Sequence, residues 1–243
     1  MREAASILPL AVEGLAYAAG GARLIAEVSF TLPAGGVVAV LGSNGAGKSL
    51  LLRLCHGLLA PGAGTIRWAA ADGAIGGRRR HAMVFQKPVM LRRSARDNVA
   101  HALRAAGASR SEAAMRADAA LARYGLADLA QRPARLMSGG EQQRLAIARA
   151  AALEPHLMFL DEPCSQLDPG ATRQVEAMLA DLSARGVTLM MATHDLAQAR
   201  RLASRVLFLD RGRLLADAPA ADFFTSPPGA EARAFLAGEL TWS

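Results

Sequence analysis

Gly42-Ser43-Asn44-Gly45-Ala46-Gly47-Lys48-Ser49 is the stretch that decides the fold of this chain. It matches the pattern GxxxxGK[ST], in which glycines let the backbone turn tightly and point its N–H groups at phosphate oxygens. Apolar, largely β-branched residues precede it at Val37–Leu41, and an apolar helical stretch follows to about Leu59. This order predicts a buried strand, a phosphate loop and a helix N-terminus. We therefore expect Lys48 to reach the β- and γ-phosphates of a nucleotide and the Ser49 hydroxyl to ligate Mg²⁺.

Further strands and helices alternate along the chain on both sides of this loop. The alternation of Val28, Phe30 and Leu32 with polar residues indicates a half-buried strand. Helical stretches near 170–185 and 195–203 separate later apolar runs. Alternation of this kind predicts βαβ units and a mainly parallel sheet. The other predicted strands are Thr65–Trp68, Met83–Phe85, Leu157–Leu160, Thr188–Ala192, Val206–Asp210 and Arg213–Ala216.

The segment from Ser94 to about Met137 has a helical pattern without strand signals. Ser94-x-x-Asp97 and Ser109-x-x-Glu112 both resemble the capping boxes that start helices, with Asp in place of the usual Glu or Gln in the first. A small helical subdomain is therefore predicted between the two halves of the sheet.

Two adjacent carboxylates, Asp161 and Glu162, follow the apolar strand Leu157–Leu160. Ligands of parallel sheets bind at the carboxyl ends of strands. Asp161 is expected to hold Mg²⁺, directly or through water, and Glu162 to polarise a water beside the γ-phosphate. Taken alone, an acidic pair could equally cap a helix, and the phosphate loop is what favours the functional interpretation.

A second candidate anion site lies at Ser138-Gly139-Gly140, which precedes a predicted helix. Backbone N–H groups at such a helix start form an anion-binding nest. As a bare string Ser-Gly-Gly is also a common flexible turn. Its place between the phosphate loop and the acidic pair favours a second phosphate site.

Taken together, these motifs resemble those of ATP-binding cassette (ABC) ATPases, in family order and over nearly the whole chain. The resemblance assigns adenine stacking to Tyr17 and the sensing of Mg²⁺ and of the channel partner to Gln86. It assigns the loop that crosses to the other subunit to Ser165–Asp168, and γ-phosphate contact to His194. A lone tyrosine or histidine is more often an ordinary core or surface residue. The assignment therefore depends on all of these residues occurring together in the family's order.

Three departures from the commonest family pattern stand out. Leu50 replaces the hydroxyl residue that often follows the magnesium serine, so one hydrogen bond to the α-phosphate is expected to be missing. Met137 and Glu141 replace Leu and Gln in the signature, and both replacements occur in working relatives. Cys164 stands where a small or β-branched residue is common, and nothing in the sequence explains it.

The resemblance implies an α/β fold: a P-loop nucleotide-binding core with a mainly parallel sheet, an antiparallel β subdomain and an inserted α-helical subdomain. One ABC ATPase domain is expected over 1–243. Its parts are the first half of the core with the β subdomain (1–93), the helical subdomain (94–139), the second half of the core (140–218) and a helical tail (219–243).

The resemblance also implies ATP and Mg²⁺ as ligands and a second copy of the chain as partner. In a head-to-tail dimer, each ATP lies between the Lys48 loop of one copy and the Ser138 nest of the other. Lys48, His194 and Mg²⁺ would stabilise the charge that develops as water attacks the γ-phosphorus, and Glu162 would orient or deprotonate that water. Transmembrane permease subunits and an external solute-binding protein complete the expected assembly.

Composition narrows the setting further. The longest uncharged stretch, Val28–Gly47, contains a proline and several glycines, so no bilayer-spanning helix is expected. No secretory leader pattern opens the chain, which favours the cytoplasmic face of the plasma membrane, reached through the permease. The net charge of +7 comes mostly from dispersed arginines without interleaved aromatic residues, so no nucleic-acid partner is expected. Cys55 and Cys164 have neither zinc-site nor disulfide spacing.

Three functions remain in competition: the ATPase of an importer, the ATPase of an exporter, and a soluble cassette acting on ribosomes or DNA. The third class carries two cassettes or long coiled-coil insertions, and neither is present; exporters often carry fused membrane spans. The stretch Gln86–Val99 and the tail around Phe223–Glu239 resemble oxyanion importers. Tungstate or molybdate is therefore the expected solute, with phosphate or amino acids as alternatives.

Overall fold

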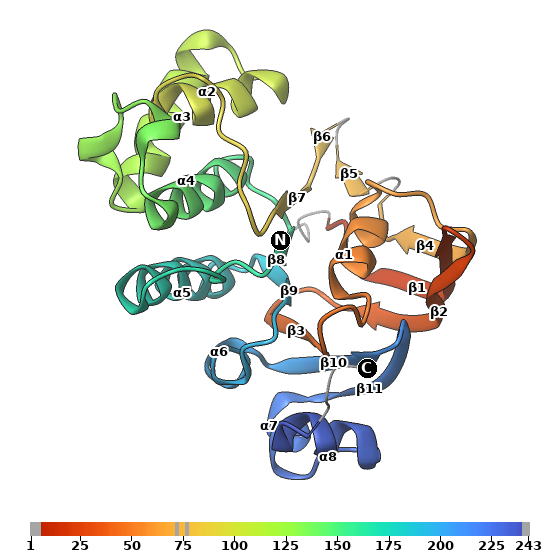
Figure 1. The fold of residues 1–243 in the computed structure, drawn as a ribbon. Helices are drawn as coiled ribbons and strands as arrows, with labels where there is room; N and C mark the ends of the chain where they lie inside the picture. The colour runs from red at the N-terminus through yellow and green to blue at the C-terminus, as the bar shows by residue number, and fades with distance from the viewer. Residues whose placement is uncertain (1–5, 71–72, 76–77, 240–243) are drawn as a thin grey trace.

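The computed structural model describes residues 6–70, 73–75 and 78–239. Within them, a six-stranded sheet with the order β11-β10-β3-β9-β8-β7 forms the centre of the molecule (Figure 1). The five strands from β10 to β7 are parallel, and β11 pairs with β10 in the antiparallel sense. The strands are β3 (Val37–Leu41), β7 (His81–Val84), β8 (Leu157–Asp161), β9 (Thr188–Ala192), β10 (Arg205–Asp210) and β11 (Arg213–Pro219).

The middle strands β3, β8 and β9 are buried along their whole length, as their continuous apolar sequences predict. Their register brings their ends together, because Ala192 of β9 is paired with Val40 on one side and with Asp161 on the other. The residues that follow these three strands therefore lie at one edge of the sheet.

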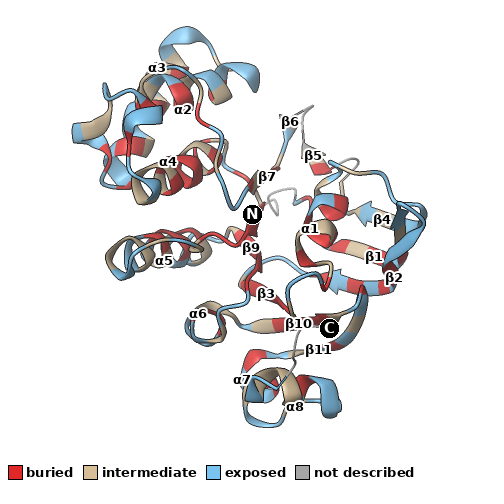
Figure 2. Cartoon of the chain, in the orientation of Figure 1, coloured by how far each residue is buried: buried red, intermediate tan, exposed pale blue. Residues whose placement is uncertain are grey.

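Helices cover the two faces of this sheet. On β8, Met158 and Leu160 belong to the hydrophobic cluster of the helices α4 (Gly139–Ala151) and α5 (Pro169–Ala184). The alternate residues Leu157 and Phe159 belong to the cluster of α1 (Lys48–His56) on the other face. Figure 2 shows the buried sides of these elements meeting around the strands. Helix α1 ends earlier than predicted, because Gly57 adopts φ 83° and its N–H bonds back into the last turn.

A second, antiparallel sheet has the order β2-β1-β4, with β1 at Leu10–Ala19, β2 at Ala22–Leu32 and β4 at Ala63–Trp68. Sequence reasoning identified only the second half of β2 and most of β4. It missed β1, because irregular pairing around Glu13 and Gly14 breaks the alternation of buried residues there. A two-stranded ladder of β5 (Ala74–Ile75) and β6 (Arg78–Arg79) precedes β7.

A helical lobe contains α2 (Ala95–Ala105) and α3 (Arg110–Arg123), with short 3-10 turns η2 (Ala127–Leu129) and η3 (Ala134–Leu136). Ser94 and Ser109 cap these helices as predicted, each accepting a hydrogen bond from the third residue beyond it. The prediction of full capping boxes there was wrong, since in the described chain the reciprocal bond forms only at Ser138, before α4. The carboxylate of Glu112 bonds to Arg116 instead.

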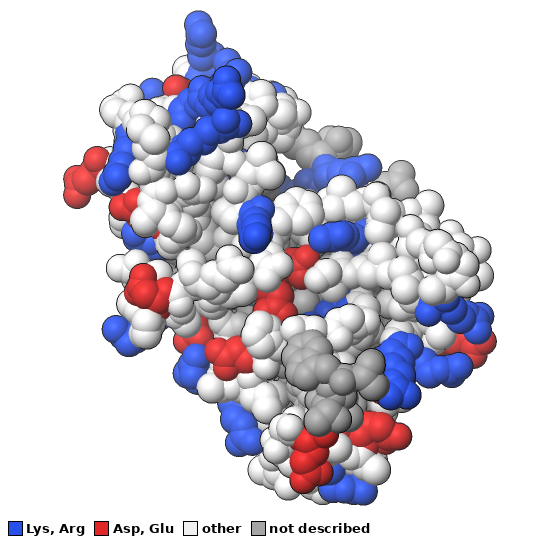
Figure 3. Space-filling model, viewed as in Figure 1, with Lys and Arg blue, Asp and Glu red and all other residues white. Residues whose placement is uncertain are grey.

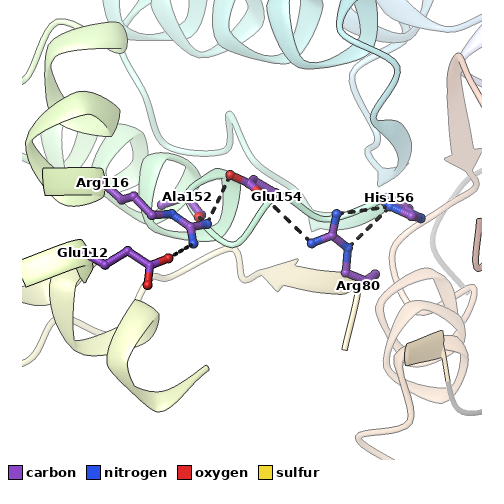
Figure 4. A network of polar contacts seen from close by, with 6 residues as sticks. All are labelled: Arg80, Glu112, Arg116, Ala152, Glu154 and His156. Atoms are coloured by element: carbon purple, nitrogen blue, oxygen red, sulfur yellow. Dashed lines mark hydrogen bonds and ion pairs between the residues drawn. The ribbon is translucent and has the colours of Figure 1, made fainter. Parts of the chain in front are cut away.

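A chain of polar contacts joins this lobe to the edge of the central sheet (Figure 4). Arg116 of α3 donates to the carbonyl oxygen of Ala152 at 2.7 Å and pairs with Glu154 at 3.2 Å. Arg80 contacts the other oxygen of the Glu154 carboxylate at 4.0 Å and the ring of His156 at 3.3–3.4 Å. The connection from α4 to β8 is thus held from both sides.

The last described helices, α7 (Ala220–Thr225) and α8 (Gly229–Ala237), pack beside α6 (Leu196–Leu202) and β10 through Phe208, Phe223 and Phe235. Among the described residues, no helix is long and apolar enough to cross a membrane. The domain boundaries stay predictions, although the elements between 94 and 139 are all helical.

Candidate functional site

The phosphate loop connects β3 to α1 at the edge where the middle strands end. Two of its glycines have no substitute. A Cβ on Gly42, at φ 151°, would lie 2.1 Å from the carbonyl oxygen of Leu209. A Cβ on Gly47, at φ 101°, would lie 2.8 Å from the Cδ1 of Ile25. The loop is therefore pressed between β10 and β2, in a conformation that only glycine allows.

Lys48 is the first residue of α1, and its side chain is buried against this loop. Its Nζ donates to the carbonyl oxygens of Gly42 and Ser43, both at 2.9 Å. Burial lowers the pKa of Lys48, and the nearby carboxylates of Glu162 and Asp161 act in the opposite direction. Within the described residues, the hydrogen bonds of this buried ammonium go to uncharged carbonyl oxygens, so its positive charge is well placed to bind an anion.

Ser49 and Asp161 meet across the gap between α1 and the end of β8. The Ser49 hydroxyl donates to Oδ1 of Asp161 at 2.5 Å, and the Asp161 side chain is only 4% exposed. Arg53, one helical turn after Ser49, faces Oδ2 of Asp161 at 3.7 Å. A hydroxyl and a carboxylate are the hard oxygen donors that Mg²⁺ prefers, so these residues fit that ion.

Glu162 and His194 form the third pair of the site. Oε2 of Glu162 lies 2.7 Å from Nδ1 of His194, which follows β9. Glu162 is almost fully buried, whereas the His194 side chain is 56% exposed. The Glu162 backbone adopts φ 49°, a conformation that is rare for residues other than glycine. Its N–H donates to the carbonyl oxygen of Ala192, which ties it to β9. Such strain at a strand end is typical of functional positions.

Gln86 and Tyr17 lie at the margins of this group. Gln86 is exposed, two residues beyond the end of β7, the strand next to β8. Tyr17 is half-buried on β1 and is paired with Ile25, the residue of β2 that lies against Gly47. Neither side chain makes a hydrogen bond within the part of the chain that the structure describes. Leu50 packs against the α1 cluster.

Ser138, Gly139 and Gly140 line a different hollow of about 440 Å³, together with Gln166–Asp168. The Ser138 hydroxyl caps α4 by accepting a hydrogen bond from the N–H of Glu141. In return, the N–H of Ser138 donates to the Glu141 carboxylate at 2.7 Å. This backbone bond is the main cause that lowers the pKa of Glu141. A Cβ on Gly140 would lie 2.7 Å from that of Ala171, which explains why glycine stands there. Asp168 caps α5 through the N–H groups of Gly170 and Ala171.

The structure therefore gathers Lys48, Ser49, Asp161, Glu162 and His194 into one cluster and places Ser138–Gly140 at another. The first cluster includes the start of α1 and the second lies at the start of α4. These two helices cover opposite faces of β8. Sequence reasoning missed Arg53, although its spacing of four from Ser49 on a helix could have indicated it. Cys164 packs partly buried against the α4 and α5 cluster, and burial raises the pKa of its thiol to about 12.

The first cluster can hold a phosphorylated anion, a divalent cation and an activated water side by side. The family model described as ABC transporter matches residues 25–165. The phosphate import ATP-binding protein of Natronomonas pharaonis is 36% identical over 96% of this chain and 88% of its own length. The tungstate uptake system ATP-binding protein of Peptoclostridium acidaminophilum is 32% identical over 85% of this chain and 97% of its own length.

Other relatives are named as methionine and cobalt import ATP-binding proteins. Among solved structures, cbiO1 of Clostridium perfringens, part of the ABC transporter complex cbiONQ, superposes with a TM-score of 0.79. It is 28% identical, and the match covers 91% of each chain. The chain therefore belongs to the ABC transporter family and is an ATPase of that family.

Proposed function

We propose that the cluster at the ends of β3, β8 and β9 hydrolyses ATP to drive a membrane importer. The observation that carries this proposal is the pairing of Ser49 with Asp161 and of Glu162 with His194 around the buried ammonium of Lys48. One pair offers oxygen ligands, the other offers a base beside an imidazole, and the lysine offers the positive charge. Phosphoryl transfer needs these three parts.

Each residue has a role that follows from its place. The N–H groups of the loop from Gly42 to Ser49 would hold the phosphates, and Lys48 would neutralise charge on the β- and γ-phosphates. Glu162 would orient the attacking water and take its proton. His194, exposed and next to Glu162, would turn to the γ-phosphate, with Gln86 near the same group. Mg²⁺ held by Ser49 and Asp161 would supply further positive charge on the phosphates. Tyr17 would stack on the adenine.

The test is hydrolysis of ATP by the purified protein with and without EDTA, next to the variant Lys48→Ala. We expect slow, Mg²⁺-dependent release of phosphate and loss of ATP binding in the variant, because the variant lacks the ammonium at the phosphates. Full ATP affinity in Lys48→Ala would reject the assignment of this site.

We also propose that two copies of the chain enclose each ATP. Within one copy, Ser138–Gly140 lie at the start of α4, on the face of the sheet opposite α1. A second copy could present its own Ser138 N-terminus to the phosphates held by Lys48. Light scattering of the purified protein with ATP should then give twice the monomer mass, and a monomer at every ATP concentration would contradict this arrangement.

The proposed docking surface for a permease is the loop from Gln86 to Arg93 with the adjacent helical lobe. In the loop, Val89 is an apolar side chain that is 71% exposed, and Phe85, directly before the loop, is 38% exposed. Lysine and arginine side chains gather over this lobe in Figure 3. This combination of apolar contacts and positive charge suits a segment of another protein. Through that permease the chain would lie on the cytoplasmic face of the membrane, with an external solute-binding protein as a further partner.

The solute that we propose is a tetrahedral oxyanion, with tungstate or molybdate first and phosphate second. The support is the resemblance of Gln86–Val99 and of the tail to oxyanion importers, together with the relatives named for tungstate and for phosphate. No residue of this chain is expected to touch the solute, since the permease and the binding protein would select it.

The test of the solute is a deletion strain given trace tungstate or molybdate, with the metal in the cells measured by mass spectrometry. We expect reduced uptake of one or both. Unchanged uptake of both, with lost uptake of methionine or cobalt, would reject the oxyanion and leave the ATPase assignment intact.

A further inference from the structure

The loop from Gln86 to Arg93 has two halves that differ in how they are held. In the first half, Gln86 and Lys87 are exposed, and their side chains make no hydrogen bonds within the described chain. In the second half, from Val89 to Arg93, side chains of α2, η3 and α4 bind the backbone at four of the five residues. The loop therefore begins as a free segment and ends as part of the lobe.

The first clamp is Arg149, on the helix that starts at the Ser138 cap. Its guanidinium donates to the carbonyl oxygen of Val89 at 3.1 Å. Burial lowers the pKa of Arg149, and no described carboxylate forms an ion pair with it. The Arg149 side chain is half-buried, and its hydrogen bond to the Val89 carbonyl oxygen offsets part of the cost of removing the guanidinium from water. Arg149 also lines a hollow of about 260 Å³ with Phe85 and Pro88.

The second clamp is Arg135, in η3, three residues before Ser138. Its Nε donates to the carbonyl oxygen of Met90 at 3.0 Å. The preceding residue, Ala134, donates its N–H to the carbonyl oxygen of Arg93 at 2.9 Å. The segment that leads into the signature is thus bonded directly to the loop.

The third clamp is Asn98 of α2, which is fully buried. Its Oδ1 accepts from the N–H of Leu91 at 2.9 Å, and its Nδ2 donates to the carbonyl oxygen of Ser94 at 2.9 Å. The same amide reaches the carbonyl oxygens of Leu91 and Arg93 at 3.4 Å. One side chain therefore fixes the end of the loop to the first helix of the lobe.

The first two clamps come from the segments directly before and after Ser138, and the third comes from α2, which packs against α4. Each clamp holds backbone rather than a side chain. Bonds to backbone fix the position of a segment whatever its side chains are. We infer that Arg149, Arg135 and Asn98 are positioning residues that transmit movement of Gln86 at the γ-phosphate to the Ser138 helix start. The inference rests on the proposed function, because it takes Gln86 to move with the nucleotide.

The test compares Arg135→Met and Arg149→Met with the parent protein. Arg135 is exposed, so its loss should leave the fold intact, and Arg149→Lys retains a donor near Val89 as the rescue variant. We expect kcat for ATP to fall about tenfold in each methionine variant, about the effect of one hydrogen bond. KM should change by less than about twofold, because the phosphate loop is untouched. Arg149→Lys should recover most of kcat. Arg104→Met is the matched control, because Arg104 is an exposed arginine of α2 that makes no hydrogen bond to the loop within the described chain.

A second readout follows the two halves of the loop separately. Spin labels on Lys87→Cys and Arg213→Cys report the free half against the core, and labels on Arg110→Cys and Arg213→Cys report the lobe, all with Cys164→Ser. In the parent, Mg-ATP should shift both distances. In the Arg135→Met, Arg149→Met double variant, only the distance from Lys87 should shift.

Any other pattern in the double variant overturns the inference, as does an unchanged kcat in both single variants. Gln86→Ala separates this failure from failure of the proposed function. A slowed Gln86→Ala with normal clamp variants rejects the inference alone. A parent protein that shows neither hydrolysis nor a nucleotide-dependent shift rejects the proposed function and the inference together.

Discussion

Glu162 and His194 are joined by a contact of 2.7 Å between Oε2 and Nδ1, across the ends of two adjacent strands. The two partners differ in freedom. Glu162 is held by its buried side chain and by the bond of its N–H to Ala192, whereas more than half of the His194 side chain is exposed. The carboxylate is therefore the fixed partner, and the imidazole is the one that can turn to a phosphate.

From this relationship we expect His194→Ala to lower kcat by about a hundredfold, because the variant loses a donor to the γ-phosphate and the contact that aligns Glu162. ATP affinity should stay within about threefold, since the phosphate loop is unchanged. Steady-state phosphate release and a nucleotide-binding titration measure the two quantities. His101→Ala, an exposed histidine of α2, is the control. Equal rates in His194→Ala and the control would place His194 outside the chemistry.

The stability of the protein should depend on His56 at mildly acid pH. Burial, together with His81 and Arg79, lowers the pKa of His56 from 6.5 to about 4. Between these values the unfolded chain binds the proton and the folded chain does not, so the free energy of unfolding falls as the pH falls from 6.5 to 4. His56→Gln removes this contribution.

Urea unfolding at several pH values between 7 and 4 measures the effect. The variant should lose less unfolding free energy over this range than the parent protein does. His156, whose pKa is also lowered by burial and by Arg80, still contributes in the same direction. His101→Gln serves as the control. An identical pH dependence of the unfolding free energy in His56→Gln and the parent would reject the assignment of this effect to His56.

Charge reversal at Arg92 and Arg93 should uncouple hydrolysis from transport. Both residues are exposed on the proposed docking surface, and glutamates there would repel a partner selected for positive charge. In the assembled transporter, we expect more ATP to be hydrolysed for each solute carried. The measurement is paired uptake and phosphate release in membrane vesicles. An unchanged ratio would show that these side chains do not contact the permease.

The sequence predicted the parallel strands because their apolar runs are buried on both faces, so Val37–Leu41 and Thr188–Ala192 were found with their observed bounds. It did not predict β1, whose pairing is irregular around Glu13 and Gly14, because a bulge interrupts the alternation on which such a prediction depends. The end of α1 at Gly57 could have been predicted from the sequence, because glycine favours the left-handed conformation found there.

Some features of the site were likewise predictable from the sequence, and others were not. Motif spacing identified Ser49 and Asp161, but only the register of β3, β8 and β9 brings them to 2.5 Å. A contact to a backbone carbonyl, such as that of Arg149 with Val89, does not depend on the type of the accepting residue. The sequence therefore could not predict such contacts. The positive φ of Glu162 likewise depends on packing around β8 and β9 rather than on residue type.

The central claim is that Glu162 activates the water that attacks ATP at this cluster. The most direct test is phosphate release by Glu162→Gln at saturating Mg-ATP, in protein shown by titration to bind the nucleotide. The amide retains the shape of the carboxylate but cannot take a proton, so we expect the rate to fall at least about a hundredfold with binding retained. Phosphate release at the rate of the parent protein would contradict the account, because it would leave Glu162 without a part in the reaction.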